Sequence, residues 1–538
     1  MEDRAGRPVP AERAGRGIAA AAVILMLGNV LSRVLGLVRE QVAAGTFGAG
    51  DAIAAFTIAD NLQTLLFDLM VSGALQAALI PVLARLVIPG QIRPDELRHV
   101  GGALVSWVAI VTGSLAALGV ILAPELVTGL TWFAGEEAAR GPETRELAIR
   151  LVRIVMPAAA LLGLGTVLQA MLHALGAVTA PALSTAARNV AIIIAMLVLA
   201  DALGVESMAW GTLAGAGLIV LLQLWPLARH GALPVPNLDF GHPAVRRMGV
   251  LYLPVFAGLL VNAVAVVVDR GLAWGAGELA VGAMRYATTL VQMLLGLVAA
   301  ATSLASLPAL ARHFGKRDEA AFAETLARVL GVVTVVILPA VAILAVTATP
   351  VVDLVFGHGA TGPDAVDAIA LALLGYLPGT VAAAWDQVLT FAYYARHNTR
   401  LPVLMGLAGV ATYFVAAFSL VGPYGMMGLV IANSLMFIVR AAGLWLAMGP
   451  AQIQPLGTAF GRSVAGAVVA SGALAAAAWL VLTALERWWL GDGLLVEVGL
   501  VTVPAVIGAV VYVAGLRVLG VRELDDMVGM IARRFGRR

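Results

Sequence analysis

Long apolar runs separated by short polar segments dominate the pattern of the chain. Runs long enough to cross a hydrocarbon core of roughly 30 Å recur fourteen times. This pattern predicts an all-α fold, a polytopic membrane protein with about fourteen transmembrane helices. The first run contains Arg33 and is too long for a cleaved signal peptide, so we predict a retained first helix. The predicted helices cover 18–45, 52–84, 100–122, 147–174, 180–200, 206–228, 247–272, 280–311, 326–346, 364–395, 401–420, 424–448, 460–483 and 495–517.

Basic residues gather on one side of these predicted helices. The segments assigned to the cytoplasm carry 23 Lys and Arg residues, the opposite side carries six, and five arginines fall within the spans. Cytoplasmic loops of membrane proteins carry such an excess of basic residues. The asymmetry predicts an even number of crossings with both termini in the cytoplasm.

An internal repeat indicates how the helices are grouped. FGAGD at 47–51 matches WGAGE at 274–278, and PVLAR at 81–85 matches PALAR at 308–312, both at an offset of 227. A weaker match aligns Pro181 with Pro402. Six helices separate the copies, so two six-helix lobes related by a pseudo-two-fold axis are expected. We predict a cytoplasmic N-terminal tail at 1–17, an N-lobe at 18–230, a C-lobe at 231–450, two further helices at 451–520 and a cytoplasmic amphipathic tail at 521–538.

Composition narrows the function. Hydrophobic residues make up 61% of the chain and charged residues 12%, which excludes a water-soluble domain. The net charge of +2 gives no electrostatic reason for nucleic-acid binding. With no cysteine there is no disulfide, thiol nucleophile or thiolate metal site. HExxH, GxSxG and Walker motifs are absent, and the single GxGxxG (Gly357, Gly359, Gly362) falls in a predicted outer loop. We therefore predict a protein that is not an enzyme and that uses no cofactor or metal.

Ionisable residues inside the spans are the candidate functional residues, because a charge at mid-membrane costs at least about 2.5–3.5 kcal/mol. Asn29, Arg33, Gly36 and Glu40 have the spacing of one helix face, and Arg39 is adjacent. Interhelical ion pairs or snorkelling explain some of these charges, above all Arg39 and Arg270 near the outer helix ends. The deeper positions favour a wet cavity, in which guanidinium groups suit a phosphorylated head group. The candidate substrate-binding residues are Arg33, Arg39, Asp60, Asp68, Arg188, Arg270 and Arg285.

Four segments of the chain resemble a known family. NVLSRVLGLVREQVAAGTFGAGDAIAAF at 29–56, SGALQAALIPVLARL at 72–86, VDRGLAWGAGELAVGAMRYATTLVQMLLGL at 268–297 and LPALARHFGKRDE at 307–319 resemble the MurJ (MviN) family of lipid II flippases, in the multidrug/oligosaccharidyl-lipid/polysaccharide exporter superfamily. The resemblance implies two lobes around a cationic cavity in a bacterial inner (cytoplasmic) membrane protein. Alternating access would carry lipid II, the undecaprenyl-diphosphate-linked peptidoglycan precursor, from the inner to the outer leaflet, which serves cell-wall synthesis and cell shape.

The family's functional residues carry over in part. Arg33 and Arg39 fall on the two helix-1 arginines that the resemblance assigns to the diphosphate and sugar head group. The arginine pair of helix 2 aligns instead with Phe67 and Asp68, and the acid one turn later with Ser72.

Helices 8 and 11 also differ from the family pattern. The helix-8 arginine aligns with Thr289, which leaves Arg285 one turn earlier as a substitute. The span 401–420 has no carboxylate, so the sodium site of some members is not evident.

The resemblance and the residues leave several functions open. An exporter of another polyprenyl-linked glycan and a non-transporting MurJ-like scaffold are the main alternatives to a lipid II flippase. A cationic-drug antiporter would use Asp60 and Asp68, and a membrane enzyme is the weakest option. Expected partners are the lipid-linked precursor, anionic phospholipids at the C-terminal tail and cell-wall synthesis proteins. Membrane potential or an ion gradient would drive transport.

Overall fold

The protein is described here by a computed structural model that covers residues 11–71, 87–88, 91–92, 94–134, 140–239, 241, 265–448, 459–488, 493–521 and 523. Nearly all of these residues are helical, which confirms the all-α membrane fold. The chain divides into two compact units, residues 1–282 and 283–538. The lobes and tails outlined from the sequence stay predictions, and nearly all of the C-terminal tail lies outside the described residues.

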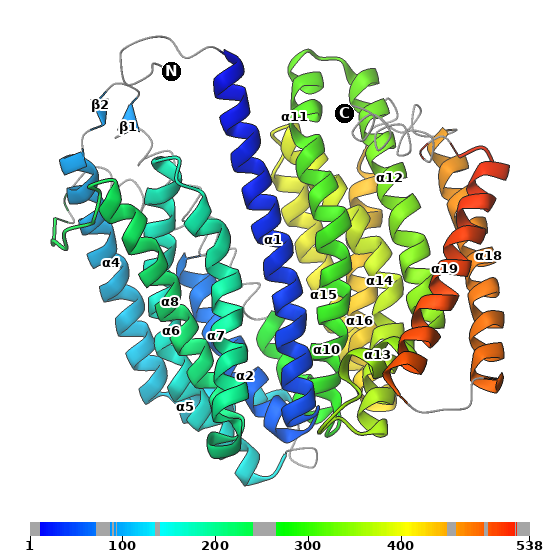
Figure 1. The fold of residues 1–538 in the computed structure, drawn as a ribbon, viewed down its shortest axis with the longest axis horizontal. Coiled ribbons are helices and arrows are strands. Elements are labelled where there is room, and N and C mark those ends of the chain that lie inside the picture. Colours follow the sequence, from blue (N-terminus) through cyan, green and yellow to red (C-terminus); the bar gives the residue numbers. More distant parts are fainter. Residues whose placement is uncertain are drawn as a thin grey trace. The chain divides into compact units, whose positions relative to one another are not determined.

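Unit 1 is a bundle of long helices around α6. This helix packs against α2, α4 and α8, and α7 packs against α1 and α8 (Figure 1). Two short strands pair antiparallel, with Val87 opposite Ile92. The elements are α1 (Ala11–Phe47), α2 (Asp51–Val71), β1 (Val87–Ile88), β2 (Gln91–Ile92), α4 (Pro94–Ile121), α5 (Ala123–Thr131), the 3₁₀ helix η1 (Trp132–Ala134), α6 (Pro142–Ala174), α7 (Thr179–Leu203) and α8 (Glu206–Arg229). Residues 265–275 are also helical.

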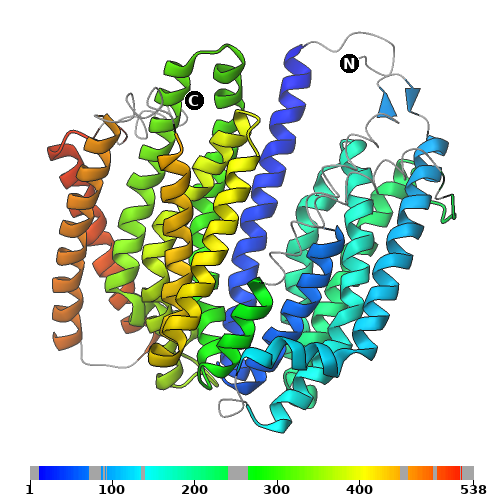
Figure 2. The ribbon, with the colours of Figure 1, turned by 180° about the vertical axis from the view of Figure 1, so that it is seen from behind.

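Unit 2 is built around α14. This helix packs against α11, α12, α13 and α16, while α18 and α19 pack together and α18 also contacts α12; the α18–α19 pair is orange and red in Figure 2. The elements are α10 (Ala280–Leu295), which begins in unit 1, the π-helix η2 (Gly296–Ala300), α11 (Ala301–Gly315), α12 (Glu319–Val346), α13 (Ala348–Phe356), α14 (Pro363–Ala395), α15 (Arg400–Tyr424), α16 (Met426–Leu446), α18 (Ala459–Trp488) and α19 (Leu494–Val518).

Eleven described helices are long and apolar enough to span a membrane. Of the three other predicted spans, 18–45 lies within α1 and the first part of 52–84 lies in α2. Most of 247–272 falls outside the described residues. The number fourteen therefore stays a prediction.

The exposed faces of the helices are apolar, as lipid requires. Val415 is 71% exposed and Leu446 78% exposed. Hydroxyl groups along the spans donate to the carbonyl four residues earlier, as Thr334 does to Leu330 at 2.6 Å. Helices suit this environment because all of their backbone hydrogen bonds are made within one segment.

The internal repeat is visible in the helix bounds. α6 and α14 both have 33 residues and start at Pro142 and Pro363, an offset of 221, and α7 and α15 follow at the same offset with 25 residues each. The residues that end α7 and α15, Gly204 and Gly425, have positive φ values of 54° and 52°. The alignment of Pro181 with Pro402 therefore matches two copies of one helix pair.

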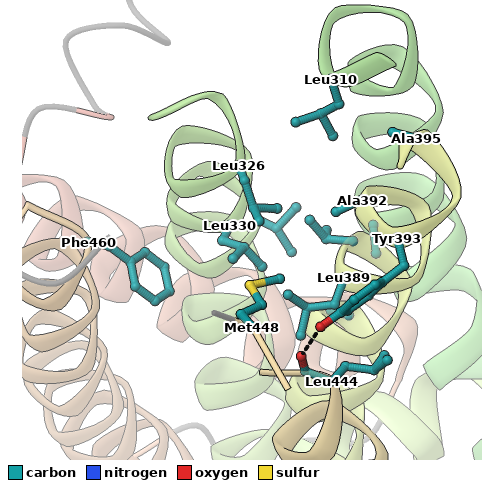
Figure 3. Close-up of a cluster of buried hydrophobic side chains, with 14 of the residues drawn as sticks. Leu310, Leu326, Leu330, Leu389, Ala392, Tyr393, Ala395, Leu444, Met448 and Phe460 are labelled. Carbon is teal, nitrogen blue, oxygen red and sulfur yellow. Dashed lines mark hydrogen bonds between the residues drawn. The ribbon is translucent and has the colours of Figure 1, made fainter. Parts of the chain in front are cut away.

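A buried apolar cluster joins five helices of unit 2, α11, α12, α14, α16 and α18 (Figure 3). The Tyr393 hydroxyl at its centre donates to the Leu444 carbonyl at 2.9 Å and so joins α14 to α16. The cluster draws Leu326 and Leu330 from α12, Leu389 and Ala392 from α14, Met448 from beyond α16, and Phe460 from α18.

Candidate functional site

Helix α1 lies close against α7 along a stripe of small residues. A Cβ atom at Gly28 would lie 2.4 Å from the Ala182 carbonyl oxygen, and one at Gly36 would lie 3.7 Å from Asn189 Nδ2. Between these glycines, the Ser32 carbonyl accepts a hydrogen bond from Asn189 Nδ2 at 3.0 Å. Small residues at four-residue spacing allow such close approach of membrane helices.

Arg39 lies at the end of this seam and is held by two partners. Its Nη1 donates to Asn189 Oδ1 at 3.2 Å, and its Nη2 forms an ion pair with Glu40 Oε1. The Glu40 side chain is only 2% exposed. Charge-assisted hydrogen bonds of this kind fix a guanidinium in place. Arg39 thus joins α1 to α7, the interhelical role that the sequence left open for it.

Arg33 lies beside the same seam. It directly follows Ser32 and is half-buried, while Asn29, one turn earlier, is exposed. Gly36 faces Asn189 of α7, and Glu40 pairs with Arg39. Of the predicted polar face, Gly36 therefore lies at the contact with α7, and Glu40 is buried beside Arg39.

Asn189 is the residue whose removal should loosen α1 most. Replacing this buried side chain by alanine removes the interhelical hydrogen bond to the Ser32 carbonyl, which keeps its bond within α1, and the bond from Arg39 Nη1. We expect Asn189→Ala to lower the free energy of unfolding by about 1–3 kcal/mol, measured as a lower melting temperature of the purified protein in detergent. Val190→Ala, at the exposed position next to it, is the matched control. Equal melting temperatures for the two variants would contradict this assignment.

The two candidate carboxylates of α2 lie two turns apart. Asp60 and Asp68 are both half-buried, and the neighbouring Asn61 donates to the Thr57 carbonyl at 2.6 Å. Eight residues of helix correspond to about 12 Å along the axis. One substrate group would therefore contact one of these carboxylates and not both.

The remaining three candidates lie on three different helices. The stem of Arg188 on α7 packs on α8, where a Cβ at Gly215 would lie 2.8 Å from its Cγ. Arg270 forms an ion pair with Asp269 at 3.5 Å, so its charge is compensated as the sequence allowed. Arg285 on α10 belongs to unit 2 and is half-buried, whereas the other six candidates belong to unit 1.

A cationic residue outside the predicted set, Arg140, has several partners among the described residues. Arg140, just before α6, has a side chain only 5% exposed and forms an ion pair with Asp51 at the start of α2. Its Nη2 donates to the carbonyls of Gly277 at 3.1 Å and Glu278 at 2.8 Å. Its Cζ lies 5.1 Å from the centre of the Trp274 ring. Burial lowers the pKa of the Arg140 guanidinium, and Asp51 opposes that shift.

Arg140 therefore joins the two copies of the repeated motif. Asp51 ends FGAGD, and the two carbonyls belong to WGAGE. The backbones also meet directly, since a Cβ at Gly282 would lie 2.2 Å from the Ala49 carbonyl oxygen. The repeat indicated that these motifs matter, but the sequence carries no signal that links Arg140 to them. We call Arg140, Asp51 and the carbonyls of 277–278 the Arg140 clasp.

Metal chemistry finds no support in the part of the chain that the structure describes. There, no three His, Cys, Asp or Glu side chains are grouped so that they could hold a metal ion. The Gly357–Gly362 stretch with the GxGxxG pattern connects α13 to α14, a loop between two helices as predicted.

Sequence comparisons find one family. The family model described as "Lipid II flippase MurJ" matches residues 43–499. A probable lipid II flippase MurJ from Vibrio cholerae is 28% identical over 512 residues, which cover 94% of this chain and 96% of the relative. One from Haemophilus influenzae is 27% identical and covers 92% of this chain and 98% of the relative.

Solved structures share the fold. A lipid II flippase MurJ in an inward closed conformation has a TM-score of 0.74 and 19% identity, with 96% of this chain and all of the other covered. An inward-facing transporter of the multidrug resistance MATE family has a TM-score of 0.64 and 14% identity, with 82% of this chain and 99% of the other covered.

Proposed function

We propose that this chain, which belongs to the MurJ family of lipid II flippases, moves lipid II from the inner to the outer leaflet of a bacterial inner membrane by alternating access. The match over residues 43–499 carries this conclusion, together with relatives that align over nearly their whole length. The eleven apolar candidate spans found among the described residues agree with a multi-pass transporter. The family is one of transporters, in line with the predicted lack of enzyme activity.

We further propose that Arg33 is the principal contact of the diphosphate. It is half-buried on α1 beside the seam with α7, whereas Arg39 joins the two helices through Asn189. Arg188 and Arg285 are proposed as secondary cationic contacts, and Asp60 and Asp68 as hydrogen-bond acceptors for sugar hydroxyls. Arg270 already pairs with Asp269 and is the weakest of the proposed contacts.

Orientation, energy source and partners are part of the same proposal. Both termini face the cytoplasm in this account, because the basic residues concentrate on that side. Transport draws on the membrane potential or an ion gradient. The arginine-rich tail at 521–538 attracts anionic phospholipids, and cell-wall synthesis proteins receive the product.

Export of another polyprenyl-linked glycan is the second candidate. It is favoured by the apolar environment of Phe67, which packs against the core between α4, α6 and α8. Thr289, at the place of the helix-8 arginine, donates its hydroxyl hydrogen to the Arg285 carbonyl at 3.0 Å. Fewer cationic groups at these two places would suit a less anionic head group.

Complementation tests the proposed function. The chain is expressed in a bacterium depleted of its own lipid II flippase, and lipid II in the outer leaflet is measured by its accessibility to an externally added enzyme. We expect restored growth and restored outer-leaflet lipid II. Protein that is inserted in the membrane but leaves lipid II in the inner leaflet would contradict the proposal. Rescue of a strain that lacks the flippase of a different polyprenyl-linked glycan would favour the second candidate.

A further inference from the structure

Unit 2 contains an ion pair inside its membrane-spanning helices. Asp386 on α14 accepts from Arg440 on α16, with Nε to Oδ1 at 3.2 Å and Nη2 to Oδ2 at 2.9 Å. The Asp386 side chain is 8% exposed and that of Arg440 27% exposed. Two charges in this environment are costly to desolvate, and an apolar pair of similar volume often serves a fold as well or better.

The internal repeat supplies such an apolar pair. At the offset of 221 that relates α6 to α14, Asp386 corresponds to Gly165 and Arg440 to Ile219. Gly165 and Ile219 also touch each other, because a Cβ at Gly165 would lie 2.8 Å from Ile219 Cγ2. In unit 1, the corresponding contact between α6 and α8 is therefore formed by uncharged residues.

Unit 2 has other ties along this seam. The Ser434 hydroxyl on α16 donates to the Gly375 carbonyl on α14 at 2.7 Å, and Tyr393 joins Leu444 as Figure 3 shows. Hydrogen bonds on either side of the ion pair already fix the register of the two helices. The contact between α14 and α16 therefore does not need the ion pair to hold the two helices in register.

Arg440 also has a counterpart in unit 1. A Cβ at Gly409 on α15 would lie 2.6 Å from Arg440 Cγ, just as Gly215 on α8 seats the stem of Arg188 on α7. Gly409 occupies the position that corresponds to Arg188, again at an offset of 221. Each unit therefore places one arginine over a glycine between the same two helices, but from opposite helices of the pair.

The guanidinium of Arg440 keeps donors for a second anion. Asp386 engages Nε and Nη2, and the Phe437 ring lies 5.7 Å from Cζ. Within the described part of the chain, these contacts leave Nη1 without a hydrogen-bond partner. A guanidinium has five N–H donors in a rigid fork, so a carboxylate on one edge leaves another edge for phosphate oxygens.

We propose that Arg440 is a further binding residue for the diphosphate of the lipid substrate and that Asp386 is its positioning residue. This inference rests on the proposed function. Phe67 and Thr289 stand at positions where the family pattern has arginines. Arg440 supplies a guanidinium from unit 2 that these two positions lack. Asp386 holds the planar group in one orientation, so that the free edge meets the phosphate without loss of side-chain entropy.

Binding of undecaprenyl diphosphate to the purified full chain tests the proposal, with undecaprenol as the uncharged comparison. Asp386→Gly combined with Arg440→Ile recreates the Gly165–Ile219 contact. Asp386→Ala with Arg440→Leu is a second apolar pair that avoids a glycine inside a helix. We expect at least one of these double variants to melt no lower than the wild type and both to bind the diphosphate about tenfold more weakly, with undecaprenol binding unchanged.

Single variants separate binding from positioning. Asp386→Asn leaves the positive charge of Arg440 in place but removes the bidentate carboxylate that orients it. We therefore expect a smaller loss of diphosphate affinity, of about threefold. Arg440→Lys should also weaken diphosphate binding, because an ammonium lacks the planar fork with which a guanidinium can contact the Asp386 carboxylate and a phosphate at the same time. In the Arg440→Ile background, Asp386→Gly should cause no further loss of affinity.

Two results would overturn this proposal alone. The first is diphosphate binding at wild-type affinity by a folded double variant, and the second is a lower melting temperature or failed folding of both double variants, which would make the ion pair structural. If the wild type prefers undecaprenol or binds neither lipid, the proposed function fails and this inference fails with it.

Discussion

Replacement of Arg33 by alanine is expected to reduce lipid II transport roughly 10- to 100-fold. Loss of a charge-assisted hydrogen bond costs about 1.5–3 kcal/mol, and about 1.4 kcal/mol corresponds to a factor of ten. Arg33 has the largest expected effect among the candidates, because it is the proposed principal contact of the diphosphate and is half-buried on α1. Outer-leaflet lipid II in the depleted strain measures the effect.

A conservative variant and a matched control accompany this test. Arg33→Lys should retain part of the activity, since it keeps the charge but not the bidentate geometry. Arg328→Ala is the matched control, because that side chain is 61% exposed and contacts Glu324 on its own helix. Transport by Arg33→Ala at the level of Arg328→Ala would show that Arg33 does not touch the substrate.

Removal of the Arg140 clasp is expected to destabilise unit 1. Arg140→Ala takes hydrogen bonds from two backbone carbonyls and leaves Asp51 without its cation. Breaking a fully buried pair costs about 3–5 kcal/mol. The Asp51 side chain is 45% exposed, so about 2–3 kcal/mol is the expected loss. The melting temperature in detergent should fall by roughly 5 °C.

Arg145→Ala is the control for the clasp. Arg145 lies five residues further along, is exposed, and donates to the Thr128 hydroxyl. Its replacement should leave the melting temperature nearly unchanged. If Arg140→Ala melts at the same temperature as this control, the contacts of Arg140 contribute nothing to the stability of unit 1.

The helices were predictable because lipid imposes a simple requirement. A span needs about twenty apolar residues, and the predicted helix 180–200 lies within α7, Thr179–Leu203. The short helices α5 and α13 were not predicted. Each has only nine residues, fewer than a span requires, so the search for long apolar runs does not detect them.

The candidate site was predictable only in part. The spacing of residues along one helix shows which side chains share a face, and it predicted a polar face that includes Arg33 and Glu40. It does not show which helix lies opposite. The pairing of Arg39 with Asn189, 150 residues away, and of Asp386 with Arg440, 54 residues away, depends on packing between helices.

Reconstitution tests the central claim most directly. The purified chain is placed in lipid vesicles that contain fluorescent lipid II, and a membrane-impermeant quencher is added outside. Without transport about half of the fluorescence stays protected, because lipid II is divided between two leaflets. We predict that the wild type exposes the protected fraction to the quencher while Arg33→Ala does not. Equal protection in vesicles with wild-type protein, with Arg33→Ala and without protein would contradict the assignment of this chain as a lipid II flippase.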